Sequence, residues 1–142
     1  MKQPEYSVSS ILCQVTTLWQ RGVKKALEAI EVTPPQSIIL SSLIFLSKQK
    51  ESVTQINLSL HSKMDPMTTS TIIRTLERKG FVKRKEHDTD TRAKAVVLTN
   101  QGMKIAKQAA RLVEKFDNQF FNVLGSKTKT FNSSLLTLIK EK

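Results

Sequence analysis

The chain has 142 residues and a hydrophobic content of 39%, which suits one compact domain with its own core. It carries 23 Lys and Arg against 12 Asp and Glu, so its formal net charge of +11 favours a polyanionic partner, either nucleic acid or an anionic membrane. One cysteine excludes an internal disulfide framework, and the lack of a signal-peptide pattern or a long apolar run predicts a cytoplasmic protein without a membrane span.

Two helices are predicted in the first third of the chain. Apolar residues recur at helical spacing over residues 9–31, which predicts a long amphipathic helix. Thr33 and Pro34 are typical of an N-cap followed by the first helical position. The helix that they begin, to about residue 48, is apolar nearly all round, so it is expected to be buried.

A helix-turn-helix is predicted next. Thr54 can cap a short helix that reaches about residue 61, and residues 63–64 form a tight turn. Asp65 and Pro66 are a second pair of N-cap and first helical residue. The helix that follows runs to residue 79 and stops at Gly80, a common C-cap.

The remaining elements complete a winged helix. Residues 81–85 and 94–98 are predicted strands joined by a polar loop, which makes a β-hairpin. Thr99 caps a long helix that is expected to end at Gly125, and a last helix follows it. The predicted fold is therefore mainly α with a small β-hairpin wing, because a hairpin directly follows a helix-turn-helix.

The second helix of the helix-turn-helix, the recognition helix, divides into two faces. Thr69, Ile72, Ile73 and Leu76 share one face, which should point to the core. Hydroxyls and free N–H groups near a helix N-terminus can bind phosphates or base edges, and arginine can bind guanine. The alternative is that the outward polar residues simply face solvent. Arg78, near the helix end, could do no more than complement the helix dipole. The candidate DNA contacts on this helix are Thr68, Ser70, Thr71, Arg74, Thr75 and Arg78.

The predicted wing supplies a second set of candidate DNA contacts. Asp90 stands two residues before Arg92, so its carboxylate could hold the guanidinium in one orientation for a narrow minor groove. The alternative is a surface loop whose charges pair for solubility, since exposed pairs contribute only about 0–1 kcal/mol. The candidate residues on the flanks of the wing are Lys83, Arg84, Lys85 and Lys94.

Residues 80–102, GFVKRKEHDTDTRAKAVVLTNQG, resemble the wing signature of the MarR family of multiple-antibiotic-resistance regulators. The shared pattern is a Gly-aromatic-Val start, an Asp-x-Arg-x-Lys tip at Asp90, Arg92 and Lys94, and a Leu-Thr-x-x-Gly exit. The resemblance covers roughly the whole chain in element order. The chain departs from the family at His61, where an apolar residue is usual, and at Thr69, where a larger aliphatic one is usual.

The resemblance implies a homodimeric transcription regulator made of one MarR-like domain, residues 1–142. Residues 33–99 would form the DNA-binding winged helix-turn-helix, and residues 1–32 and 100–142 would form the helical dimerisation platform. Such proteins bind pseudo-palindromic double-stranded DNA. They often act as repressors that release DNA when a small phenolic or lipophilic effector binds between platform and winged part, where Trp19 and Phe45 are the candidate lining residues.

The sequence also bears on three further classes of site: a reactive cysteine, a metal site and an enzyme or cofactor site. Cys13 stands in a Leu-Cys context that resembles the hydroperoxide sensors of the same family, which also supply tyrosines near the thiolate. This chain has only Tyr6, before the first helix, and no aromatic residue soon after Cys13, so a buried, inert cysteine in the dimer interface is favoured. No His, Cys, Asp and Glu cluster has metal-ligand spacing. No nucleophile–base pair or cofactor motif points to an enzyme or to a bound cofactor.

The leading hypothesis is a sequence-specific DNA-binding regulator. The alternatives are an architectural DNA-binding protein without sequence preference, a redox-sensing regulator that uses Cys13, and a protein-interaction module with a winged fold. Binding to a membrane surface is disfavoured, because the basic residues concentrate on the hairpin and not along a basic amphipathic helix.

Overall fold

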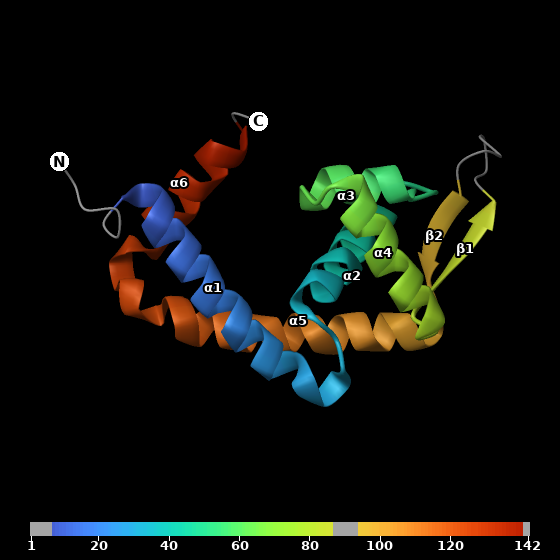
Figure 1. The fold of residues 1–142 in the computed structure, drawn as a ribbon, viewed down its shortest axis with the longest axis horizontal. Helices are drawn as coiled ribbons and strands as arrows, with labels where there is room; N and C mark the ends of the chain where they lie inside the picture. The colour runs from blue at the N-terminus through green and yellow to red at the C-terminus, as the bar shows by residue number, and fades with distance from the viewer. Residues whose placement is uncertain (1–6, 87–93, 141–142) are drawn as a thin grey trace.

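The computed structural model describes residues 7–86 and 94–140. Its elements, in chain order, are α1 Val8–Leu27, the 3₁₀ turn η2 Glu28–Ile30, α2 Pro34–Ser47, α3 Gln55–Ser62, α4 Pro66–Arg78, β1 Val82–Glu86, β2 Lys94–Leu98, α5 Asn100–Phe121, the 3₁₀ segment η3 Asn122–Lys127 and α6 Thr128–Lys140. The predicted order of helices around a helix-turn-helix and a hairpin is confirmed. Figure 1 shows α5 as a long helix that links the β-hairpin to the end of the molecule where α1 and α6 lie.

The predicted N-caps are present and explain where the helices begin. The side chains of Thr33, Thr54, Asp65 and Thr99 each accept a hydrogen bond from the backbone N–H three residues later. These bonds satisfy backbone donors that the first turn of a helix leaves without a partner. The helix-turn-helix is closed at Lys63, whose positive φ of 65° reverses the chain between α3 and α4.

Two predicted helix ends are wrong. The first helix ends at Leu27, four residues before the predicted end, and continues as η2 to a left-handed Glu31 with φ 54°. This bend of the chain brings Val32 into the core, where it is 4% exposed. The long helix ends at Phe121, before Gly125, which takes φ 53° and ψ −123° inside η3.

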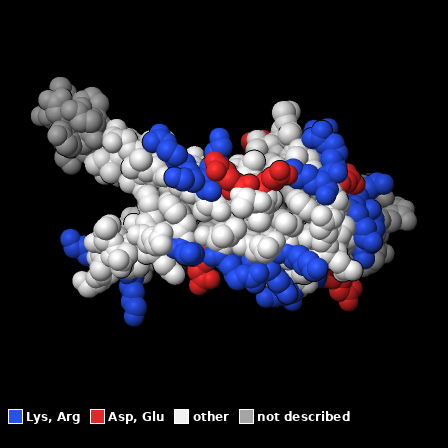
Figure 2. Space-filling model, turned by 90° about the horizontal axis from the view of Figure 1, so that it is seen from below, with Lys and Arg blue, Asp and Glu red and all other residues white. Residues whose placement is uncertain are grey.

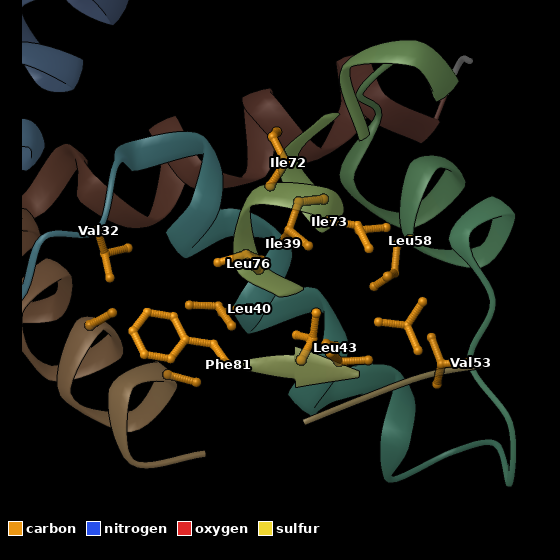
Figure 3. Packing of buried hydrophobic residues seen from close by; sticks show 14 of the residues in the cluster. Val32, Ile39, Leu40, Leu43, Val53, Leu58, Ile72, Ile73, Leu76 and Phe81 are labelled. Atoms are coloured by element: carbon orange, nitrogen blue, oxygen red, sulfur yellow. The ribbon is translucent and has the colours of Figure 1, made fainter. Parts of the chain in front are cut away.

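One hydrophobic core holds the winged part together, with α2 at its centre. As predicted, α2 is largely buried, and its Ile39, Leu40 and Leu43 are fully enclosed. Figure 3 shows these side chains pointing toward Leu58 of α3 and Leu76 of α4. The buried faces of α3 and α4 thus meet on α2, and this packing sets the position of α4.

The wing is an antiparallel hairpin in which Val82 pairs with Leu98 and Glu86 with Lys94. The Val96 N–H also donates to the Val53 carbonyl at 2.7 Å, so the segment before α3 pairs with the outer side of β2. This bond fixes the base of the wing to the helix-turn-helix. The predicted wing tip, including Asp90 and Arg92, lies outside the described residues.

The two terminal segments pack on each other through α1 and α5. At Gly22 an added Cβ would lie 2.0 Å from the Phe116 ring, so only glycine allows this close approach. Nearby, Trp19 Nε1 donates to Asp117 Oδ1 at 2.7 Å. Within the described residues no single helix is long and apolar enough to cross a membrane, although α1 and α2 together reach the required length and hydropathy across a bend of 78°.

Candidate nucleic-acid interface

The recognition helix α4 has the two faces that the sequence predicts. Thr69, Ile73 and Leu76 are fully buried, whereas Thr68, Thr71, Arg74 and Arg78 are exposed and Ser70 and Thr75 are partly exposed. The unusual Thr69 is compatible with the core because its hydroxyl donates to the Asp65 carbonyl at 2.9 Å. The whole predicted outward face of α4 is therefore open to a partner.

The threonine hydroxyls on this face already donate within their own helix. Thr71 and Thr75 donate to the carbonyls of Met67 and Thr71, each at 3.1 Å. In this arrangement the oxygens have only lone pairs left to offer. They therefore suit the amino groups of adenine and cytosine in the major groove better than phosphate oxygens.

A carboxylate occupies the N-terminus of α4. Asp65 accepts from the Thr68 hydroxyl at 2.7 Å and from the Thr68 backbone N–H at 2.9 Å. These bonds, the hydroxyl one first, hold the pKa of Asp65 below its ordinary value, so Asp65 is ionised at neutral pH. A phosphate at this helix end would meet a negative charge, which disfavours the phosphate contact that the sequence predicts there.

The basic side chains near α4 fall into two groups. Arg74, Lys83, Lys85 and Lys94 are exposed and form no ion pair within the part of the chain that the structure describes. Arg84 is different, because its Nε lies 3.6 Å from Glu77 Oε1 and its side chain is 28% exposed. Arg84 thus joins the wing to α4, while its neighbours in β1 face outward.

Two further basic residues have contacts within the fold. Arg78 Nη2 donates to the Thr75 hydroxyl at 3.1 Å, which orients the guanidinium along the outward face of α4. Lys79 Nζ donates to the Glu31 carbonyl at 2.6 Å and to Gln36 Oε1 at 3.2 Å. Lys79 therefore holds the end of α4 against the segment before α2, a contact that the sequence pattern did not reveal.

Positive charge is not confined to the side of α4. An exposed row of basic residues, which we call the α5 stripe, follows one face of α5 and consists of Lys104, Lys107, Arg111 and Lys115. Because the buried residues Ala106 and Ala109 lie on the other face of the helix, the stripe points away from the core. Figure 2 shows Lys and Arg on this side of the molecule, seen from below. Net charge alone therefore does not locate the DNA contact.

A pocket of about 720 Å³ lies between the terminal helices and the winged part. Both predicted lining residues, Trp19 and Phe45, are in its wall. His61, which was not predicted to line the pocket, stacks on Phe45 with ring centroids 4.9 Å apart, and its Nδ1 lies 2.8 Å from Ser42 Oγ. The sequence signal for this role was the departure from the family pattern at position 61, where histidine replaces the usual apolar residue. The full lining is Trp19, Ser37, Ile38, Ser41, Ser42, Phe45, His61, Ser62, Ala109, Ala110, Val113, Glu114, Asp117 and Asn118.

Cys13 is exposed in the single chain, so the predicted burial of this thiol is not seen there. It lies in a shallow hollow on α1 with Ser10, Gln14 and Leu18, and none of the residues that line this hollow is charged. Among the described residues, no group of three or more His, Cys, Asp and Glu side chains could hold a metal ion.

Comparison with known proteins identifies relatives over nearly the full length. Residues 32–115 match the family described as ArnR1-like, winged-helix domain. The chain is also 36% identical, over 137 residues, to the uncharacterised HTH-type transcriptional regulator YdcH of Bacillus subtilis strain 168. That alignment covers 96% of this chain and 92% of YdcH, so the two proteins are similar over nearly their full lengths.

Two solved structures have the same fold. A mutant of MarR from E. coli, in complex with operator DNA, has a TM-score of 0.83 and 20% identity and covers 97% of this chain and 99% of that one. CouR from Rhodococcus jostii, bound to p-coumaroyl-CoA, has a TM-score of 0.82 and 22% identity, with coverage of 97% and 93%. The expected winged-helix architecture and its resemblance to MarR are confirmed.

Proposed function

Because the chain belongs to the ArnR1-like winged-helix family and is a helix-turn-helix transcriptional regulator with the MarR fold, we propose that it is a ligand-responsive repressor that binds a specific operator. The observation that carries this proposal is the exposed face of α4. Its hydroxyls and arginines stand on a helix that a capped turn and a packed core hold in place beside the wing. A rigid polar helix of this kind can enter the major groove.

Binding to both halves of a pseudo-palindromic operator requires a homodimer. We propose that residues 1–32 and 100–142 form its dimerisation platform. α6 supports this proposal because none of its described residues is buried in the single chain. Its apolar side chains Leu136, Leu138 and Ile139 are 45–58% exposed, as are Ile11, Leu12 and Leu18 of α1 at 45–53%. Exposed apolar surface of this kind on α1 and α6 is typical of a face that a second copy covers.

In the proposed complex, residues 33–99 bind DNA, with α4 in the major groove and the wings in the flanking minor grooves. Lys83, Lys85 and Lys94 would neutralise phosphates beside the groove, and Arg92 would enter it with support from Asp90. We expect Arg92→Ala to weaken operator binding by about 1–3 kcal/mol and to leave the dimer folded. Operator affinity equal to that of the unmodified protein would refute this role of the wing.

The pocket between the terminal helices and the winged part is the proposed effector site, and the protein is proposed to work in the cytoplasm. The redox alternative has little support, because the hollow around Cys13 offers no charged group to stabilise a thiolate. The architectural alternative has a specific observation in its favour. The α5 stripe could bind phosphates without sequence preference.

The test is fluorescence anisotropy of the purified protein on its own upstream intergenic DNA and on a scrambled duplex, over a series of salt concentrations. We expect affinity for the native duplex to exceed that for the scrambled one by about a thousandfold or more. If the native duplex is not preferred, selection from genomic fragments tests for an operator elsewhere. Failure of that selection to enrich any sequence would favour the architectural protein.

A further inference from the structure

We propose that the pocket between the terminal helices and the winged part binds an aromatic cation. This inference deepens the proposed effector site and names the charge of its ligand. Its starting point is an imbalance of charge. Among the described residues that line the pocket are two carboxylates, Glu114 and Asp117, and no Lys or Arg, in a chain whose net charge is +11.

The two carboxylates are placed to meet a ligand. They stand three residues apart on α5, so they lie on the same face of that helix. Glu114 is exposed and forms no ion pair within the residues that the structure describes. Asp117 is half-buried, and the bond of 2.7 Å from Trp19 Nε1 to Oδ1 fixes its orientation while Oδ2 has no bond to Trp19.

Aromatic rings complete the walls. Phe45 from α2 and His61 from α3 stack with an interplanar angle of 23°, and Trp19 from α1 stands beside Asp117. A flat cation can contact ring faces favourably and pair with a carboxylate at the same time. Ser41 and Ser42 add hydroxyls for the orientation of the ligand.

The same charges disfavour an anion. A carboxylate or phosphate ligand would meet Glu114 and Asp117 without a Lys or Arg among the described lining residues to compensate. CouR, with a comparable fold, is bound to p-coumaroyl-CoA, which carries phosphates. The charge of the pocket in this chain disfavours an anionic ligand of that kind.

The position of the pocket connects the ligand to DNA binding. One wall comes from α1 and α5 and the other from α2 and α3, and α3 is the first helix of the helix-turn-helix. Figure 1 shows α2 above α5, with which it is in contact, and α3 farther from α5. A cation that contacts both walls changes the orientation of α4 relative to the platform, so its binding is coupled to operator binding.

Isothermal titration calorimetry of the full chain without DNA tests the inference. The probes are 1-methylquinolinium and 2-naphthoate, which are fused two-ring aromatic ions of similar size and opposite charge. We expect the cation to bind at least about tenfold more tightly than the anion. Quenching of Trp19, the only tryptophan of the chain, reports binding in this pocket independently. Tighter binding of 2-naphthoate, or no binding of 1-methylquinolinium, overturns the inference.

Charge-neutral variants identify the carboxylates. Glu114→Gln changes an exposed side chain, and Asp117→Asn keeps an oxygen that can accept from Trp19. The double variant should bind 1-methylquinolinium about tenfold more weakly or worse, and its affinity for 2-naphthoate should not fall. Glu51→Gln, which removes one negative charge outside the pocket, should change neither value. Unchanged cation binding in the double variant refutes the site.

The same proteins, titrated onto the native duplex by anisotropy, separate the two proposals. If the protein binds the native duplex specifically but does not bind the cation, the proposed ligand class is wrong and the proposed regulator stands. Cation binding by a protein without a preferred DNA sequence overturns the proposed operator and leaves the pocket assignment standing.

Discussion

At the junction of the wing and α5, a few residues close a network that explains the Leu-Thr-x-x-Gly pattern. The Thr99 hydroxyl donates to the Gly80 carbonyl at 2.6 Å and accepts from the Gly102 N–H at 2.9 Å. The Thr99 N–H donates to the Phe81 carbonyl at 3.1 Å. The end of α4, the start of β1 and the first turn of α5 are thereby joined at one point.

This network predicts that Gly102→Ala is destabilising. An added Cβ would lie 1.8 Å from the Phe81 carbonyl oxygen, so the backbone on one side must move. We expect the free energy of unfolding, measured in urea, to fall by about 1–3 kcal/mol. Gln108→Ala, on the exposed face of the same helix, is the control and should change it little. Unchanged stability of the Gly102 variant would mean that this junction is free to shift.

The DNA contact can be tested at the level of one arginine. Arg74 is exposed on the outward face of α4, whereas Arg111 is exposed in the α5 stripe. Arg74→Ala should weaken operator binding by about 1–3 kcal/mol, because it removes a base or phosphate contact. Arg111→Ala removes the same charge elsewhere and should have a much smaller effect in the same anisotropy assay. Equal losses would show that general charge, and not the face of α4, determines affinity.

Among the elements, α6 depends most on a partner. Its exposed Leu138 is predicted to lie in the dimer interface, so Leu138→Asp should produce folded monomers in sedimentation equilibrium. Ser133→Asp introduces the same charge on the other face of α6 and should leave the dimer intact. Phe131 is a less suitable target because its ring lies 6.1 Å from that of Phe121 in the same chain. A Leu138→Asp dimer of unchanged stability would refute this interface.

The positions of helix ends and faces show how much of the structure the sequence could predict. Helix starts at Thr33, Thr54 and Thr99 were predictable, because an N-cap is a contact within four residues. The outward face of α4 was predictable because it follows from helical periodicity alone. The end of α1 was not, because the packing of Val32 in a distant core determines it. His61 and the pair of Arg84 with Glu77 were missed for the same reason, since each contact joins two elements.

For the whole molecule, the question is whether its net charge of +11 binds DNA on one side or on several. α2 contacts both α4 and α5, and the exposed faces of these two helices point away from it on different sides. A duplex that contacts the face of α4 and the wing therefore leaves the α5 stripe in solvent. An architectural protein would instead use both surfaces.

Neutralising the α5 stripe distinguishes these two modes of binding. We expect the variant with Lys104, Lys107, Arg111 and Lys115 all changed to Gln to keep its operator affinity and the slope of log K against log salt concentration. Each neutralised phosphate contributes about −0.9 to that slope, so four lost contacts would make it shallower by about 3 to 4. Such a change, together with weaker binding to native and scrambled duplexes alike, would place DNA on the α5 stripe. An unchanged slope in this variant and a shallower one for Arg74→Ala would assign the contact to α4.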